Sequence, residues 1–162
     1  MGLMATFFAL EVTPIREDPW RYAGPSLDYR LRRLEETLSS LATFEGLGPT
    51  EWEGEGPYCL APAYGLLVAV HHLLYTGYHL LKAKIGIVPR GYDEVVEQLA
   101  KASVISKDLA SRLSTIAELR EQLVHPYPPP DSNWIVAALE TVPRDLADFA
   151  REIRDWLGER PS

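Results

Sequence analysis

The sequence predicts an all-α protein: an antiparallel helical bundle of about five helices, preceded by a short extended N-terminal arm. Two observations favour this fold class. Leucines recur at alternating spacings of four and three in several segments, the period of an amphipathic helix. Clusters of Gly and Pro separate these segments and indicate turns. The 162 residues suit one domain, which we divide into an arm (1–25) and a helical bundle (26–160).

The first 25 residues differ from the rest of the chain. The segment "ATFFALEVTP" has the aromatic and β-branched content of a short strand or an extended arm, and the prolines and glycine after it indicate a loop. Ser26 is a suitable N-cap for the first helix. One apolar stripe follows it, formed by Leu27, Leu31, Leu34, Leu38 and Leu41. The Gly-, Pro- and Glu-rich segment 45–57 is predicted to be a loop.

A long apolar segment, 61–85, is predicted to be the central helix because it is apolar on more than one side. Gly65 and Gly77 would let neighbouring helices approach it closely. A shorter helix is expected over 92–102. The next helix opens at Ser106, and its buried stripe is Leu109, Leu113, Ile116, Leu119 and Leu123. The last helix begins near Ser132 and is expected to kink at Pro143.

Composition limits the function classes. A net charge of −7 argues against broad, sequence-independent nucleic-acid binding. The single cysteine, Cys59, excludes an internal disulfide and a cysteine-based metal cluster. No apolar run reaches the length of a membrane span, and the start of the chain lacks the features of a signal peptide. We expect a cytoplasmic protein without membrane contact.

The segment "LREQLVHPYPPP", 119–130, contains the candidate catalytic residues. On a straight helix Arg120 and His125 would point roughly 140° apart. Pro126 disfavours the α conformation at His125, so the two side chains can converge, within one chain or across a dimer interface. Such a pair suits metal-free cleavage of RNA through its own 2′-hydroxyl, with histidine as acid or base and arginine stabilising the transition state.

Spacing alone leaves a second interpretation open, because Arg120 and His125 are also cations of the kind that stabilise a helix C-terminus. Two basic segments, "KAKIGIVPR" and "YRLRR", are similarly ambiguous. "KAKIGIVPR" supplies Lys82, Lys84 and Arg90 as candidates for contact with an RNA backbone, but such residues are also typical of solvated helix ends.

The segment "LREQLVHPY", followed by a long terminal helix, resembles the R-x4-H-x-Y motif of HepT-like HEPN toxins, of the HepT/MntA toxin–antitoxin type. The resemblance covers about 61–157 and includes, in order, a long helix, a G-x-x-P-x-x-Y turn, a short helix, an S-V-I-S break and the motif helix. It implies a HEPN-like bundle and a homodimeric RNase toxin whose cleft brings two motifs together. It also implies a minimal nucleotidyltransferase antitoxin that silences the toxin by attaching AMP to a tyrosine.

By position, the resemblance makes Arg120 and His125 catalytic and Tyr127 the modified residue. Tyr127 lies between Pro126 and three further prolines, so a stiff segment would present it to another enzyme. The chain departs from the family at Glu121, where Asn, Asp or His is common. Glu121 is therefore a candidate modulator that either orients His125 or repels phosphate. The arm and the 45–57 loop also depart from the family pattern.

Three histidines, His71, His72 and His79, share the central helix with Tyr75 and Tyr78. Their surroundings offer no carboxylate ligands, so polar core or dimer-seam roles are favoured over a metal site, and we expect no cofactor. Tyr64, Tyr75 and Tyr78 are interpreted as packing aromatics.

Three function hypotheses follow: an RNase toxin, a catalytically silent HEPN subunit that binds a nucleotidyltransferase or a nucleotide, and a plain helical dimer.

Overall fold

The computed structural model describes residues 26–48, 60–125 and 132–158, and within these ranges it contains helices and turns but no strand. The all-α prediction is therefore confirmed. The elements are α1 (Leu27–Leu41), the 3-10 turn η1 (Ala42–Phe44), α2 (Leu60–Leu80), the π-helical turn η4 (Leu81–Ile85), α3 (Tyr92–Lys101), α4 (Lys107–Arg112), α5 (Ile116–Val124) and α6 (Ser132–Trp156). The predicted arm and most of the 45–57 loop lie outside the described residues and stay predictions.

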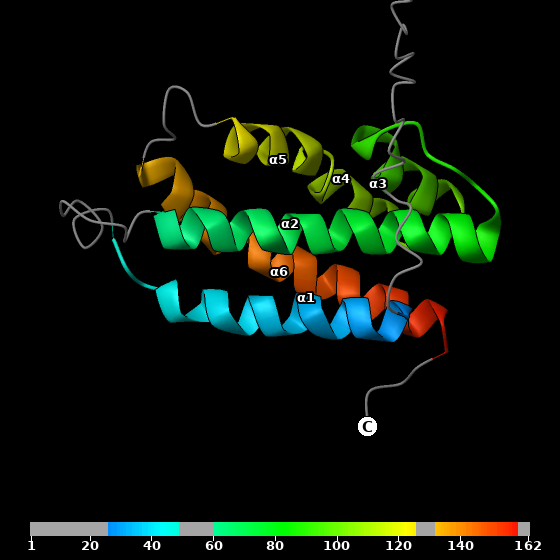
Figure 1. The fold of residues 1–162 in the computed structure, drawn as a ribbon, viewed down its shortest axis with the longest axis horizontal. Helices are drawn as coiled ribbons and strands as arrows, with labels where there is room; N and C mark the ends of the chain where they lie inside the picture. Colours follow the sequence, from blue (N-terminus) through cyan, green and yellow to red (C-terminus); the bar gives the residue numbers. More distant parts are fainter. Residues whose placement is uncertain (1–25, 49–59, 126–131, 159–162) are drawn as a thin grey trace, which may run out of the picture.

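Helix α2 is the centre of the bundle. It packs against α1, α6, α5 and α3. Figure 1 shows it between a layer of α1 and α6 and a layer of α3, α4 and α5. Helix α1 runs antiparallel to both α2 and α6, which point the same way (Figure 1). The buried positions form one apolar core, which explains why α2 has to be apolar on several sides.

The leucine stripe of α1 faces this core as the spacing predicts. Leu31, Leu34 and Leu41 are buried, and Leu27 and Leu38 pack at its edge. The hydroxyl oxygen of Ser26 accepts a hydrogen bond from the Tyr29 N–H at 3.3 Å, so the predicted N-cap is confirmed.

Two glycines of α2 lie where neighbouring helices come closest. A Cβ added at Gly65 would lie 2.7 Å from Cδ2 of Leu41 in α1. A Cβ at Gly77 would lie 2.7 Å from Cγ1 of Val95 and 2.9 Å from Cδ1 of Leu99, both in α3. The close approach expected at these glycines is confirmed.

One prediction about the helices is wrong in part. The single helix expected from Ser106 is two helices, because the chain turns at Leu113–Thr115 between α4 and α5. Ser114 and Thr115 lower the local helix propensity through a competing hydroxyl and a β-branched side chain. The buried stripe itself is preserved: Leu109, Leu113, Ile116 and Leu123 are buried and Leu119 packs against the core. The turn therefore redirects α5 without exposing its apolar face.

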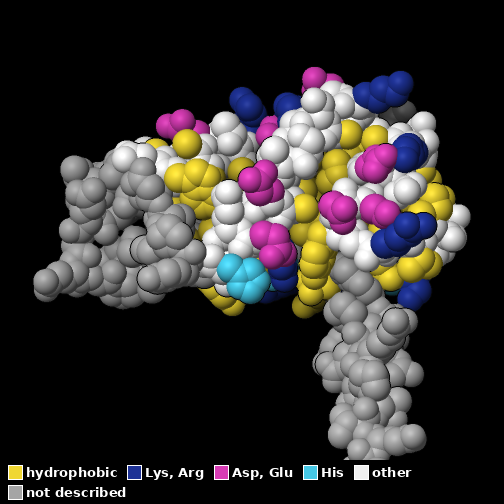
Figure 2. Space-filling model, turned by 90° about the horizontal axis from the view of Figure 1, so that it is seen from above, with side chains coloured by type: hydrophobic (Ala, Val, Ile, Leu, Met, Phe, Trp, Pro, Cys, Tyr) yellow, Lys and Arg dark blue, Asp and Glu magenta, His cyan; other side chains and the backbone are white. Residues whose placement is uncertain are grey.

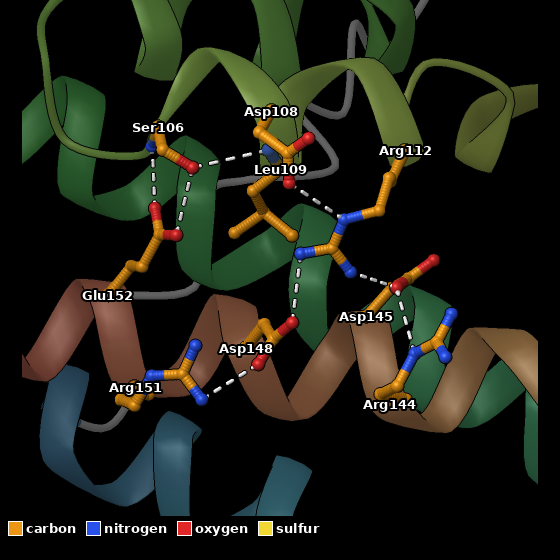
Figure 3. Close-up of polar contacts among 9 residues, drawn as sticks. All are labelled: Ser106, Asp108, Leu109, Arg112, Arg144, Asp145, Asp148, Arg151 and Glu152. Atoms are coloured by element: carbon orange, nitrogen blue, oxygen red, sulfur yellow. Dashed lines mark hydrogen bonds and ion pairs between the residues drawn. The ribbon is translucent and has the colours of Figure 1, made fainter.

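Helix α6 runs through Pro143 and is tied to α4 by ionic contacts (Figure 3). Arg112 of α4 donates to Asp148 at 2.8 Å and to Asp108 at 3.2 Å, and it also pairs with Asp145. The Ser106 N–H and hydroxyl donate to Glu152 at 2.5 and 2.9 Å. These contacts hold α4 on α6, and the following turn then sets where α5 begins.

Candidate functional site

Helix α5 carries the R-x4-H motif and ends where proline chemistry predicts. His125 is its C-terminal cap residue, with φ −116° and ψ 65°, outside the α-helical region. Its N–H still donates to the Glu121 carbonyl at 3.0 Å. The sequence prediction that His125 leaves the helix is confirmed. Pro126 and Tyr127 lie outside the described residues, so the position of the predicted AMP acceptor stays untested.

Glu121 lies between the two candidate catalytic side chains. Nη1 of Arg120 donates to Oε1 of Glu121, and Nε2 of His125 lies 3.7 Å from Oε2 of the same carboxylate. The His125 side chain is 75% exposed, whereas Arg120 is only 19% exposed. The two side chains therefore converge on a shared carboxylate, and the histidine is the more accessible of the two.

The other sides of the Arg120 guanidinium contact residues that lie outside the motif. Nε donates to Nε2 of His71 in α2 at 3.4 Å. The guanidinium carbon lies 4.9 Å from the centroid of the Tyr92 ring in α3, within cation–π range. Sequence reasoning did not assign either contact, because His71 and Tyr92 are far from Arg120 along the chain. The remaining nitrogen, Nη2, donates to none of the described residues, so both of its hydrogens can donate to a ligand.

The three α2 histidines are held towards the neutral form. Burial, and then the positive charge of Arg120, lower the pKa of His71. Burial is also the first cause of the lowered pKa of His72 and of His79, followed by nearby arginines of α1. No group of three or more His, Cys, Asp or Glu side chains within the described ranges is arranged to hold a metal ion.

The predicted packing roles of the α2 tyrosines are only partly correct. Tyr78 is buried, and Tyr75 packs edge-on against the rings of both His71 and Tyr92. Tyr64 is 68% exposed, so its packing assignment is wrong within this chain. The Tyr64 side chain points away from the core, because the neighbouring helices α1, α3, α5 and α6 cover the other faces of α2.

Two of the three candidate RNA-backbone residues, Lys82 and Lys84, lie away from the motif (Figure 1). Lys82 and Lys84 are exposed in η4, and Arg90 is exposed just before α3. His71 contacts Arg120 of the motif, and Lys82 follows His71 by 11 residues, which is roughly 16 Å along a helix. In Figure 1, η4 and the C-terminal end of α5 lie at opposite ends of the bundle. The structure therefore does not bring Lys82 and Lys84 together with His125. Arg90 lies nearer the site, because it precedes by two residues Tyr92, whose ring lies 4.9 Å from the Arg120 guanidinium.

The surface over α3, α4 and α5 has no continuous basic area. Figure 2 shows acidic and basic side chains interspersed with apolar ones on this face. Exposed acids on it include Asp93, Glu97, Glu118 and Glu121. Attraction of a phosphate on this face has to come from local contacts such as Arg120. Among the helices that the structure describes, none is both long and apolar enough to cross a bilayer.

Comparison with known proteins finds relatives of this chain in sequence and in structure. In sequence, the chain is 27% identical over 130 residues to a Bacillus subtilis protein named "Putative RNase YutE", covering 77% of this chain and 88% of YutE. It is also 27% identical over 127 residues to an Archaeoglobus fulgidus protein named "Putative RNase", covering 78% and 92% of the two chains.

Solved structures share the fold. The structure of YutE, described as a cytosolic protein of unknown function, superposes with a TM-score of 0.69 at 23% identity, over 84% of this chain and 93% of YutE. A structure described as a tri-AMPylated Shewanella oneidensis HEPN toxin in complex with MNT antitoxin gives a TM-score of 0.71 at 15% identity, over 80% and 96% of the chains. A family model described as "Ribonuclease HepT-like" matches residues 31–153, most of the chain. The chain belongs to the HepT-like ribonuclease family.

Proposed function

We propose that this protein is a metal-independent endoribonuclease, the toxin of a cytoplasmic toxin–antitoxin pair, and that Arg120 and His125 are its catalytic residues. The observation that carries the proposal is the end of α5, where an exposed histidine and a guanidinium converge on one carboxylate in a chain of the HepT-like ribonuclease family. The family supports the class of activity, and the arrangement supports the roles of the residues.

The proposed reaction uses the RNA 2′-hydroxyl as the nucleophile. His125 removes the hydroxyl proton, the 2′-oxygen bonds to phosphorus, and the 5′-oxygen leaves with a proton supplied by a histidine, giving a 2′,3′-cyclic phosphate and a 5′-hydroxyl. Negative charge accumulates on the non-bridging oxygens during this step. Nη2 of Arg120 is the donor that can reach it.

We also propose that the active form is a homodimer whose cleft joins two motifs, so that one histidine serves as base and the other as acid. The test is a mixed dimer of parent and His125→Ala subunits, isolated with a different tag on each subunit. It retains one histidine, so it should cleave no RNA if one histidine serves as base and the other as acid. Cleavage by the mixed dimer at about half the parent rate would argue that each copy acts alone.

The partner proposed is a minimal nucleotidyltransferase antitoxin that attaches AMP to Tyr127. Structural relatives include a HEPN toxin in complex with an MNT antitoxin, which supports this class of partner. Lys82, Lys84 and Arg90 are proposed as contacts for RNA phosphates on either side of the cleaved bond. Lys82 and Lys84, at the end of the bundle far from His125 (Figure 1), suit phosphates a few nucleotides away, and Arg90, two residues before Tyr92, suits a phosphate nearer the cleaved bond.

Glu121 favours one alternative, a catalytically silent HEPN subunit that binds a nucleotidyltransferase or a nucleotide. Its carboxylate already occupies one donor of Arg120 and faces His125, so it competes with phosphate for both groups.

Cleavage of RNA in EDTA by purified protein of unmodified mass decides between these functions. The variants are His125→Ala and, as a matched control, His79→Ala, which removes an imidazole that does not contact Arg120. Cleavage by the parent and the control, but not by His125→Ala, would support the nuclease. Equal cleavage by His125→Ala would remove His125 from the mechanism. Folded, unmodified parent that cleaves no RNA would favour the silent subunit.

A further inference from the structure

Arg120 is restrained on three sides, and two of the restraining residues lie outside its own helix. His71 of α2 accepts from Nε at 3.4 Å, Tyr92 of α3 lies under the guanidinium at 4.9 Å, and Glu121 accepts from Nη1. The Arg120 side chain is 19% exposed, so most of it lies against these neighbours. A long arginine side chain in water samples many rotamers, and contacts on this many sides remove most of them.

The His71 contact requires one protonation state. A guanidinium has donors only, so Nε2 of His71 must be an unprotonated acceptor and the proton of the neutral ring must be on Nδ1. Burial together with the charge of Arg120 lowers the pKa of His71, which keeps the ring neutral near pH 7. The observed geometry and the protonation state therefore agree.

The Tyr92 contact is supported from behind by a second aromatic ring. Tyr75 and Tyr92 pack edge-to-face with centroids 6.5 Å apart, and Tyr75 packs against His71 at 5.8 Å. Burial and a hydrogen bond with Tyr75 raise the pKa of Tyr92 to about 12, so the phenol is uncharged throughout the physiological range. His71, Tyr75 and Tyr92 form one aromatic wall along the Arg120 side chain.

We propose that His71 and Tyr92 are positioning residues that fix the plane of the Arg120 guanidinium, His71 as a hydrogen-bond acceptor and Tyr92 as a cation–π platform, so that Nη2 is presented to the RNA phosphate. This inference rests on the proposed ribonuclease function. A fixed donor needs no reorganisation when charge develops on the phosphate, which is how preorganised groups accelerate a reaction. Without these contacts the guanidinium would still be charged, but Nη2 would no longer be held in one orientation towards the phosphate.

Acidification should weaken the arrangement. The titratable and charged groups around His71 are Arg120 from α5, His72 and Tyr75 from α2, and Tyr92 from α3; Arg30, Arg33 and Glu36 of α1 act on His72, and Glu121 pairs with Arg120. Burial, and then the positive charge of Arg120, lower the pKa of His71. As the pH falls through the lowered pKa of His71, the ring gains a proton, can no longer accept from Nε, and repels Arg120.

The first experiment needs no nuclease activity. In ¹⁵N-labelled full-length protein, the Nε–H signal of Arg120 is assigned by its absence in Arg120→Lys, and its exchange with water is measured. His71→Leu removes the acceptor, and exchange should become faster by on the order of 10-fold. His71→Gln places an amide oxygen near the position of Nε2 and should keep exchange close to that of the parent. Unchanged exchange in folded His71→Leu would overturn the role of His71.

The second experiment measures RNA cleavage by the same variants across pH. His71→Leu should lose on the order of 10-fold, mainly in kcat, and His71→Gln should keep most of the rate. The cleavage rate of the parent should fall as the pH drops through the pKa of His71, and His71→Gln should lack this part of the fall. A merely structural role of His71 would not predict that difference. Tyr92→Phe keeps the ring face and should be active, whereas Tyr92→Leu should lose activity. His79→Gln is the matched control.

The two experiments separate failure of the inference from failure of the proposed function. If the parent cleaves no RNA but Nε exchange depends on His71, the ribonuclease proposal fails while the positioning of Arg120 stands. If the parent cleaves RNA and folded His71→Leu matches it in both exchange and kcat, the positioning role is wrong and the nuclease stands.

Discussion

Oε2 of Glu121 lies 3.7 Å from Nε2 of His125, one helical turn further along the chain, while the other oxygen of the same carboxylate pairs with Arg120. This relationship places a negative charge between the two groups expected to meet a phosphate. It makes Glu121 the residue that most directly tunes the candidate site.

We predict that Glu121→Gln binds RNA more tightly. An uncharged amide no longer repels phosphate, and its oxygen can still accept from Arg120. KM should fall by about 3- to 5-fold at low ionic strength, and the difference should shrink as salt screens the charge. Steady-state cleavage at two salt concentrations measures this, with Glu140→Gln as the control because it is an exposed acid on α6. A higher KM for Glu121→Gln would show that orientation by the carboxylate outweighs repulsion.

Tyr127 is predicted to be the acceptor of AMP. Tyr127→Phe lacks the phenolic oxygen, so it should keep nuclease activity but gain no mass when incubated with the nucleotidyltransferase partner and ATP. Intact-mass spectrometry checks the outcome. Tyr64→Phe is the matched control, because Tyr64 is a strongly exposed tyrosine of α2 and loss of its hydroxyl should leave the modification intact. Addition of AMP to Tyr127→Phe would place the modified residue elsewhere.

The α4–α6 contacts predict a pH-dependent share of stability. The hydrogen bond from Arg112 is the first cause of a lowered pKa at Asp148 in the folded protein. A carboxyl whose folded pKa is depressed stabilises the fold above its unfolded pKa and loses that contribution as pH falls through the folded pKa. Asp148→Asn should therefore lower the melting temperature by about 1–3 °C at pH 6.

The difference between Asp148→Asn and the parent should then narrow as the pH falls below the ordinary aspartate range. Urea unfolding at pH 6 and at a pH below the ordinary aspartate range measures the difference in free energy of unfolding. Asp155→Asn, on the exposed side of α6, is the control. A difference that stays constant down to low pH would mean that the Asp148 charge adds no stability.

Gly77 is predicted to be required by the packing of α3 on α2. An alanine Cβ would collide with Val95 and Leu99 together, whereas helix propensity alone favours alanine. We expect Gly77→Ala to lower the free energy of unfolding by about 1–2 kcal/mol. Gly65→Ala meets only the end of the Leu41 side chain, which can rotate, so it should be nearly neutral. Chemical denaturation of both variants checks the difference, and equal stability would argue that α3 shifts freely.

Local sequence patterns are enough to predict most of the bundle. The four-and-three spacing of leucines identifies the buried face of α1, and the nearly continuous apolar content of α2 predicts its central place. Pro126 predicts that His125 leaves the helix, because the constraint acts between neighbouring residues. The R-x4-H motif likewise indicates its own chemistry, since both residues lie on one short segment.

Tertiary packing decides what local patterns do not contain. Ser114 and Thr115 weaken the helix locally at Leu113–Thr115, but the direction of the chain after this break depends on how α4 is held on α6 and α5 on α2, while the leucine stripe continues across it. His71 and Tyr92 meet Arg120 only because α2, α3 and α5 pack together, and no spacing along the chain connects them. Periodicity reports which face of a helix is buried, because burial repeats with the helical turn. Which side chains meet across that face depends on how the helices are placed around the core.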